Sequence, residues 1–316
     1  SMTQDPLERA KLNSFRMFCS GIGGVGCSIL VPVLSEKLGT TPQNGYQRAM
    51  IVLSVIMVIS FLTAGIACKE RVPESALDKS EPFRWKDLPT QITKNRPLLI
   101  LFIMFLSAYT YNILVSSVGT YFVTYNIDGK ISMATWSLLQ TLPSIVPMLF
   151  VPSIAKRIGK KMVVITGCVI STIGMLMFAF MPANMLIGFC IGKSLGAFGY
   201  GMTLATIWST LPDCVEYGEY KTGRRCGGLV FSLASFSIKI SLTIAGIVPT
   251  IVFSFVDYVP NGVQNASCLL AIKMMNSLIP AIVLIIGILA YTKYELTEQR
   301  FDEIVEELAK RRLENK

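Results

Sequence analysis

The stretch PDCVEYGEYKTGRRCGG, residues 212–228, gathers acids and bases between two long apolar runs. The charged side chains are those of Asp213, Glu216, Glu219, Lys221, Arg224 and Arg225. Carboxylates and guanidinium groups at this spacing form charge-assisted ion pairs, with one another or with a facing segment. A chain this apolar needs a reason to collect charge at one place, so these residues are candidates for a functional cluster.

Three lysines, Lys193, Lys239 and Lys273, lie inside apolar runs. A charge inside a membrane span is costly and by default marks a pathway or a binding site. Lys273 lies near the start of its run and can reach the interface, whereas Lys193 and Lys239 lie roughly 13 to 18 Å deep at 1.5 Å per residue. All twenty acids fall in loops, tails or run ends. The two deep lysines therefore need a wet cavity or counter-charges outside this chain, and structural ion pairs are the alternative.

A polar stripe runs along one apolar segment at helical spacing. Its members are Tyr109, Asn112, Ser116 and Thr120. Such a stripe either lines the path of a polar ligand or makes hydrogen bonds between helices, and the sequence favours neither. A second repeat, Gly188, Gly192 and Gly196, predicts a close approach of two helix backbones.

The residue types for enzyme chemistry are sparse. The chain has no histidine, and its eight cysteines form no C-x-x-C pair. A serine or cysteine nucleophile would lack its usual base, and neither a zinc site nor a disulfide framework is indicated. We therefore predict no metal, no cofactor and no enzyme.

The elements that must position these residues are membrane helices. Apolar residues make up 52% of the 316 residues and charged residues 16%, and the mean hydropathy is +0.55. Eight apolar runs approach the length of about 20 residues that crosses a hydrocarbon layer about 30 Å thick. The runs are 13–34, 48–68, 97–124, 134–155, 162–181, 185–211, 227–256 and 268–292.

These runs predict an all-α transmembrane bundle. Lipid offers no partner to backbone amides, so each span must satisfy its own, and the alternation of a membrane barrel is missing. Prolines within the runs mark expected kinks or broken turns. They are Pro32, Pro143, Pro147, Pro249 and Pro280.

The basic residues predict the orientation. Of the 29 lysines and arginines, 23 lie on one side of the eight spans, three on the other and three within them. Short cytoplasmic loops are enriched in these residues, so both termini are expected in the cytoplasm. The net charge of +9 then reflects the enrichment of cytoplasmic loops in lysine and arginine. The bases form no single patch, which excludes a nucleic-acid partner and leaves the lipid bilayer.

The two ends of the chain carry further expectations. The start, SMTQDPLERAKLNSFR, is polar and has no signal-peptide core, so we expect a truncation before Ser1. After Tyr294, apolar residues recur at helical spacing among charges and predict an amphipathic helix that packs under the bundle. They are Leu296, Phe301, Ile304, Val305 and Leu308.

Three segments, TQDPLERAKLNSFR (3–16), KNRPLLIL (94–101) and above all LPDCVEYGEYKTGRRCGG (211–228), resemble a known family. They are similar to the glycoside, pentoside and hexuronide cation symporters, the melibiose-permease-like branch of the major facilitator superfamily. The resemblance implies twelve helices in two halves, with sugar and cation bound between them near the midplane. This chain would supply helices five to twelve: two helices in 1–68, a cytoplasmic loop in 69–96, six helices in 97–293 and the tail in 294–316. The protein is expected to be a monomer.

The resemblance also implies a sugar site. Arg16 matches the sugar-site arginine of the family, and Lys239 matches a helix-eleven lysine beside the site. Trp208 is a candidate aromatic platform, although it lies closer to Asp213 than the tryptophan of the family does. With the residues above, the candidate sugar contacts are Arg16, Tyr109, Asn112, Lys193, Trp208 and Lys239. The coupling ion, Na+ or H+, would bind on helices that precede this chain.

The charged stretch then becomes a candidate cytoplasmic gate. Alternating access requires contacts that form in one state and break in the other. The candidate gate residues are Asp213, Glu216, Glu219, Arg224 and Arg225. The alternative is a solvated loop that obeys the positive-inside rule.

These patterns predict a secondary transporter, a cation-coupled symporter of a glycoside, pentoside or hexuronide in the cytoplasmic membrane. As a fragment it would be inactive, because a site shared between two halves would lack one wall. The alternative is a membrane-embedded scaffold or enzyme. An intramembrane enzyme would show clustered His, Asp or Glu within its spans, and the sequence shows none.

Overall fold

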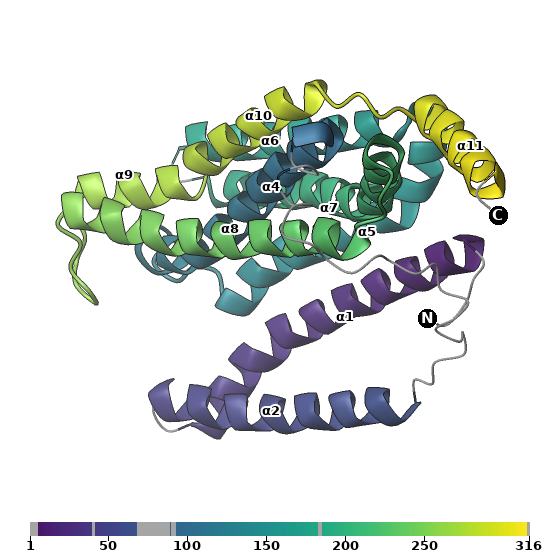
Figure 1. The fold of residues 1–316 in the computed structure, drawn as a ribbon. Coiled ribbons are helices and arrows are strands. Elements are labelled where there is room, and N and C mark those ends of the chain that lie inside the picture. Colours follow the sequence, from purple (N-terminus) through teal and green to yellow (C-terminus); the bar gives the residue numbers. More distant parts are fainter. Residues whose placement is uncertain (1–5, 40–41, 68–88, 90–92, 183–184, 315–316) are drawn as a thin grey trace. The chain divides into compact units, whose positions relative to one another are not determined.

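The computed structural model describes residues 6–39, 42–67, 89, 93–182 and 185–314, and the regular elements within these ranges are helices (Figure 1). Contacts divide the chain into two compact units. Unit 1 comprises residues 1–79 and 133–142, and unit 2 comprises residues 80–132 and 143–316. Most of the predicted cytoplasmic loop 69–96 lies outside the described residues.

Unit 1 is built on two paired helices, α1 (Pro6–Leu38) and α2 (Pro42–Ala67) (Figure 1). Gly45 permits their close approach, since a Cβ atom there would overlap the carbonyl group of Ser35. Arg48 donates a hydrogen bond of 2.7 Å to the carbonyl oxygen of Leu38 at the end of α1, which satisfies an acceptor that the helix end leaves open. Helix α2 exposes large apolar side chains along its length, as expected of a helix that faces lipid.

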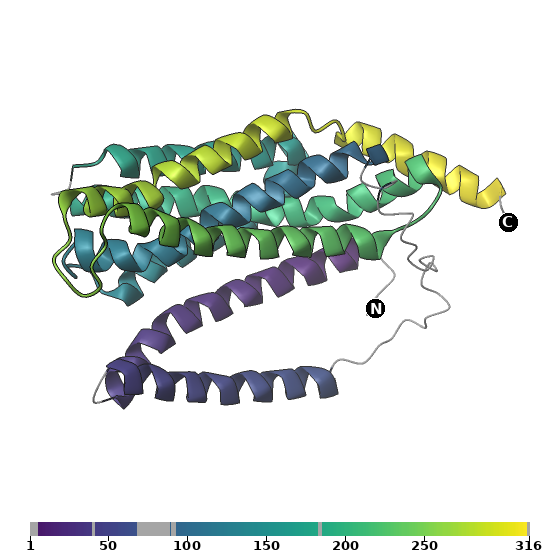
Figure 2. The ribbon, with the colours of Figure 1, turned by 60° about the vertical axis from the view of Figure 1, so that its left-hand side comes forward.

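Unit 2 holds the remaining helices (Figure 2). They are α4 (Arg96–Tyr121), which continues as the π-helix Phe122–Asn126, α5 (Met133–Ile158), α6 (Lys160–Phe180), α7 (Leu186–Thr222), α8 (Gly227–Phe255), α9 (Ala266–Met275), α10 (Leu278–Thr292) and α11 (Glu298–Glu314). Helix α4 packs against α7, α8 and α10, and α6 packs against α7 and α10. The core draws residues from α4, α6, α7, α8, α10 and α11. Helix α5 contributes its residues 133–142 to unit 1.

Six helical segments in the described residues are long and apolar enough to cross a membrane. They are Asn44–Ala67, Arg96–Asn126, Met133–Ile158, Lys160–Phe180, Gly227–Phe255 and Ala266–Thr292. The predicted spans 13–34 and 185–211 are helical as well, but they are not among the six. The all-helical membrane bundle is therefore confirmed, and eight spans remain an expectation.

Glycines form the seam between α6 and α7. A Cβ atom on Gly174 would lie 2.5 Å from the backbone nitrogen of Gly196 and 2.6 Å from the carbonyl oxygen of Gly192. A Cβ atom on Gly199 would lie 2.2 Å from the carbonyl oxygen of Gly167. Side chains at these positions would force the two backbones apart. The close approach predicted from Gly188, Gly192 and Gly196 is confirmed at Gly192 and Gly196, with the α6 glycines as its other half. A Cβ atom on Gly188 would instead meet the Met181 side chain.

The predicted span 268–292 is broken between α9 and α10 at Asn276 and Ser277. Pro280, in the first turn of α10, has no N–H group with which to continue the α9 ladder. Just before the break, the Lys273 ammonium donates to the carbonyl oxygen of Met181, at 2.7 Å, at the end of α6. This lysine therefore satisfies an open acceptor at a helix end.

Helix α7 continues far beyond its predicted end at residue 211. It runs to Thr222 and stops at Gly223, which has the left-handed conformation, φ +72°, typical of a helix C-terminus. Pro212 lies inside the helix and leaves the carbonyl oxygen of Trp208, four residues earlier, without a backbone donor. The expectation of a charged loop over residues 212–228 is wrong for most of its length. The acids lie on the last turns of α7, where the chain has left the apolar run and polar side chains no longer oppose a helix.

Candidate functional site

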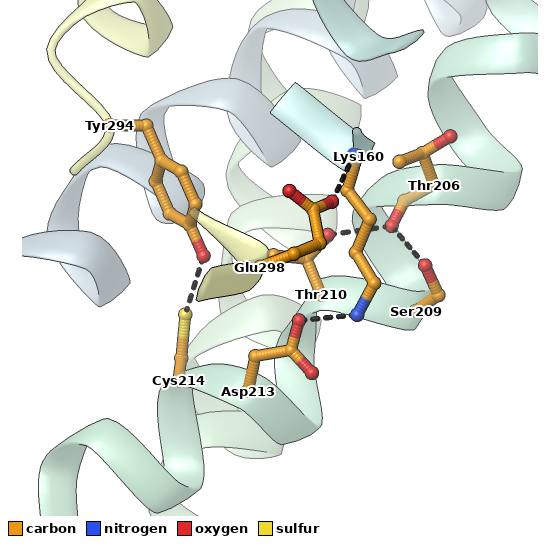
Figure 3. Close-up of polar contacts among 8 residues, drawn as sticks. All are labelled: Lys160, Thr206, Ser209, Thr210, Asp213, Cys214, Tyr294 and Glu298. Carbon is orange, nitrogen blue, oxygen red and sulfur yellow. Dashed lines mark hydrogen bonds and ion pairs between the residues drawn. The ribbon is translucent and has the colours of Figure 1, made fainter. Parts of the chain in front are cut away.

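An ion pair joins the start of α6 to the charged end of α7 (Figure 3). Helix α6 begins at Lys160, directly after Gly159, whose φ is +83°. The Lys160 ammonium donates to Oδ2 of Asp213 at 2.5 Å. The side chain of Asp213 is 12% exposed and that of Lys160 is 32% exposed. The pair is thus shielded on its acidic side and open to solvent on its basic side.

The tail helix meets the same point. The backbone N–H of Lys160 donates to Oε1 of Glu298, the first residue of α11, so a carboxylate lies at the positive end of the α6 dipole. The neighbouring Lys161 ammonium donates to the carbonyl oxygens of Thr292 at 2.7 Å and of Tyr294 at 2.8 Å. The first turn of α6 therefore holds the end of α10 and the start of α11.

Burial and charge act against each other at Asp213, which lies beyond the predicted span 185–211. Burial raises the pKa of Asp213 to about 6, while the Lys160 ammonium lowers it, and the nearby acids Glu216 and Glu298 raise it. Above this pKa the carboxylate is ionised and pairs with Lys160. Burial also raises the pKa of the neighbouring Cys214 thiol to about 12, and its Sγ lies 3.7 Å from the Tyr294 hydroxyl.

The remaining gate candidates lie around the turn between α7 and α8. The Arg225 guanidinium is 3.3 Å from Oε2 of Glu219, so both partners of this ion pair belong to one unit. Thr222 Oγ1 hydrogen-bonds the backbone of Arg224, and Glu216 is half-buried. Ion pairs from these residues to another half of the protein remain a prediction.

Trp208 and Tyr109, two of the candidate sugar contacts, meet between α7 and α4. The indole Nε1 of Trp208 donates to the Tyr109 hydroxyl at 2.9 Å. Phe105, one turn before Tyr109, presents its ring to Trp208 edge-on, with centroids 5.3 Å apart, and lies parallel to the Tyr109 ring at 6.1 Å. Both polar rings are half-buried. The structure thus forms one aromatic cluster from residues about a hundred positions apart.

The other polar residues of the α4 stripe extend from this cluster. Asn112 is half-buried, whereas Ser116 and Thr120 are exposed, so the outer part of the stripe is not covered by described helices. The Thr120 hydroxyl donates to the carbonyl oxygen of Ser117 on its own helix. A path for a polar ligand and hydrogen bonds to a further helix therefore both remain predictions for this stripe.

Two of the remaining sugar candidates, Lys193 and Lys239, lie on other parts of unit 2. Lys193 is buried in α7, with 2% of its surface exposed. Lys239 is exposed on α8. The side of α8 that contacts α4 is marked by Ser241, whose hydroxyl donates to the carbonyl oxygen of Leu106. The two lysines expected at similar depth therefore differ in environment. The side chain of Arg16 lies outside the described residues.

Reasoning from the sequence missed Lys160, Glu298 and Asn95. Asn95 is fully buried, caps α4 by accepting from the Leu98 N–H at 3.1 Å, and donates to the carbonyl oxygen of Cys214 at 2.9 Å. A cap before the proline-containing run at residue 96 could have revealed Asn95. Lys160 and Glu298 looked like ordinary charges at element starts, and no local pattern links them.

Metal chemistry has no visible basis in the described part of the chain. Within it, no group of three or more His, Cys, Asp or Glu side chains could hold a metal ion. The arrangement offers instead an aromatic cluster with hydrogen-bonding groups and a set of ion pairs at one end of the same helix, α7.

Comparison with known proteins identifies the family of the chain. Residues 1–298 match the family described as MFS/sugar transport protein. The chain is 30% identical over 315 residues to the "Uncharacterized symporter YnaJ" of Bacillus subtilis (strain 168), covering 98% of this chain and 67% of that protein. It is 28% identical to the "Glucuronide carrier protein homolog" of Escherichia coli (strain K12), covering 99% and 68%. It is 30% identical to the "Isoprimeverose transporter" of Lactiplantibacillus pentosus, covering 89% and 59%.

The chain spans about two thirds of the length of most of these relatives. The resemblance to glycoside, pentoside and hexuronide cation symporters is confirmed, and the family consists of transporters rather than enzymes. The apolar helices and these relatives make this a multi-pass membrane protein. By its match over nearly its whole length, the chain belongs to the MFS/sugar transport protein family.

Proposed function

We propose that this chain is part of a secondary transporter that carries a glycoside, pentoside or hexuronide together with Na+ or H+. The family assignment over residues 1–298 supports sugar transport. Relatives named as a symporter, a glucuronide carrier homologue and an isoprimeverose transporter support the substrate class. The protein would act as a monomer in the cytoplasmic membrane, with both termini of the chain in the cytoplasm, as the distribution of basic residues favours.

The observation that carries the sugar site is the hydrogen bond between Trp208 and Tyr109. The apolar face of a pyranose stacks on aromatic rings, while neighbouring polar groups fix its hydroxyls. Here the indole and phenol rings come from two helices, and Asn112 follows one turn along α4. In the proposed site these residues contact the sugar. Arg16, Lys193 and Lys239 remain further candidates for sugar contacts. The site of the coupling ion would use carboxylates outside this chain.

The ion pairs at the end of α7 form the proposed cytoplasmic gate. Lys160 pairs with Asp213, and Arg225 pairs with Glu219. In the proposed cycle such pairs re-form with new partners as the two halves rock. Glu216→Gln in a full-length homologue should change the rate of transport more than the affinity for sugar. Unchanged uptake and exchange rates would remove the gate from the proposal.

Sugar binding is tested most directly through the aromatic cluster. Trp208→Phe keeps a ring and loses the indole donor, whereas Trp208→Ala loses both. Loss of a stacking ring costs about 1 kcal/mol, or several-fold in affinity, so the alanine variant should bind labelled glycosides more weakly than the phenylalanine variant. Phe180→Ala serves as the control, because this ring is exposed on α6.

The assay is counterflow of labelled glycosides in membrane vesicles, with the chain as given and with a version extended at its N-terminus by the upstream coding sequence. The proposal expects exchange in the extended version and its reduction by both Trp208 variants. If the extended protein inserts but moves no glycoside, pentoside or hexuronide, the function is wrong and a scaffold becomes the better account.

A further inference from the structure

The tail helix α11 is held against the charged end of α7 by apolar and polar contacts. Ile304 and Leu308 are buried in the core of unit 2, and Phe301 packs against it. Toward the end of α11, the Arg311 guanidinium lies 4.9 Å from the centre of the Tyr220 ring and donates to the carbonyl oxygen of Tyr220 at 3.3 Å. The tail therefore touches the last turn of α7, which leads into the proposed gate.

At its start, α11 makes a contact of a different kind. The Glu298 carboxylate accepts the backbone N–H of Lys160 at the start of α6. Gly159 leaves room for it, since a Cβ atom there would lie 2.9 Å from Oε2 of Glu298. Lys160 is consequently fixed at two points, by Glu298 at its backbone and by Asp213 at its ammonium, and Figure 3 shows it between these carboxylates.

We infer that Glu298 is a positioning residue for the Lys160–Asp213 ion pair, through which the docking of α11 controls the charged end of α7. The inference rests on the proposed function only in treating that ion pair as part of a gate. Docked, α11 holds the first turn of α6 so that the Lys160 ammonium points at Asp213. Undocked, it leaves Lys160 without this anchor, and the charged end of α7 loses its ion pair with α6.

The charges around Asp213 predict the direction in which its pKa should change when Glu298 is replaced. The groups that act on it or lie beside it are Lys160 from α6, Glu216 and Cys214 from α7, Tyr291 from α10, Tyr294 after α10, and Glu298 from α11. Burial and both glutamates raise the pKa of Asp213, and Lys160 lowers it. Removing the Glu298 charge takes away one of the raising effects. If Lys160 is released as well, its lowering effect, which is larger than the raising effect of Glu298, is lost. The titration of Asp213 should then move to higher pH.

Cys214 provides a native reporter for this contact. Its side chain is fully buried next to Asp213, against the Tyr294 hydroxyl, so alkylation requires that the end of α7 opens. The experiment replaces the other seven of the eight cysteines by serine in the full chain and measures alkylation of Cys214 by a maleimide in detergent, from pH 5 to 8. Each variant is compared with the parent at the same pH, which cancels the ionisation of the thiol itself.

Glu298→Gln should label roughly tenfold faster than the parent at pH 7.5, the effect of losing one hydrogen bond to a charged group. The pH midpoint of its labelling rate should lie above that of the parent, because Asp213 loses the Lys160 ammonium. Glu303→Gln removes an exposed acid of the same helix and should match the parent. Glu298→Asp keeps the charge on a shorter side chain and should restore part of the protection.

Coupling to Asp213 is tested with Asp213→Asn, alone and combined with Glu298→Gln. If Glu298 acts through Lys160, the two rate factors are less than multiplicative and the pH step disappears in both asparagine variants. Multiplicative factors, or a Glu298→Gln midpoint equal to or below that of Glu303→Gln, would overturn the inference and leave a docking role alone. No sugar is needed, so absent glycoside counterflow would refute the proposed function without touching this result.

Discussion

Lys160→Met should destabilise the protein because it leaves the shielded Asp213 carboxylate without its counter-charge. Asp213 keeps 12% of its side chain exposed, while the lysine that pairs with it keeps 32%. Breaking a buried ion pair costs about 3 to 5 kcal/mol, and an exposed pair contributes only about 0 to 1 kcal/mol. The half-shielded geometry puts the expected loss between these limits, at about 2 kcal/mol near pH 7.5.

The loss should depend on pH in a defined direction. The pKa of Asp213 is raised from 3.8 to about 6, so the folded protein binds this proton more tightly than the unfolded chain does. The contribution of Asp213 to stability is therefore fully present below about pH 4 and falls as the pH rises toward 6. Without Lys160 the pKa rises further. The penalty of Lys160→Met should then be largest above pH 6 and should shrink toward pH 5, where the carboxyl group is neutral.

Thermal unfolding in detergent at pH 5 and pH 8 measures this, for Lys160→Met, Asp213→Asn and the double variant. The double variant should lie within about 1 kcal/mol of Asp213→Asn, since no stranded charge remains. Lys161→Met is the matched control, because its ammonium donates to carbonyl oxygens rather than to an acid. The reasoning fails if both lysine variants show the same penalty at the two pH values, or if the effects of Lys160→Met and Asp213→Asn simply add.

Two further stability changes follow from the packing of unit 2. Gly174→Ala should cost about 1 to 3 kcal/mol, since its Cβ atom would press on the backbone near Gly192. Gly246→Ala, where nothing lies within 4 Å, should be neutral or stabilising, and equal losses in thermal unfolding would contradict the seam. Asn95→Ala should cost about 2 kcal/mol through the lost cap and the open carbonyl of Cys214. Hydrogen exchange at the start of α4 should rise, and unchanged protection there would argue against the cap.

The helical membrane architecture could be predicted from the sequence because lipid imposes a strong constraint. Long apolar runs must be helices, and the glycine repeat of α7 at residues 188, 192 and 196 predicted a close helix contact. The partner glycines Gly167 and Gly174 on α6 lie seven residues apart, on one face of the helix. They form no small-xxx-small repeat, so the seam could be expected but its second half was not named.

Helix ends and polar contacts were harder to predict. The charged stretch after residue 211 was expected to be a loop, because charge marks the end of a membrane span. It does not mark the end of a helix, and α7 stops only where Gly223 adopts a left-handed conformation. Pairing between Lys160 and Asp213 depends on the crossing of α6 and α7, which no local spacing records. Trp208 and Tyr109 were both candidates, yet their hydrogen bond could be seen only in three dimensions.

Pro212 has a mechanical consequence for α7. It lies between Trp208 and Asp213 and removes one rung of the backbone ladder there. The part of α7 before it packs against α6 through glycines. The part after it is held by side-chain contacts, which include those of Lys160, Asn95 and Arg311. The missing hydrogen bond thus lies between Trp208, the proposed sugar contact, and Asp213, a proposed gate residue. The part of α7 before Pro212 can therefore stay fixed while the part after it moves.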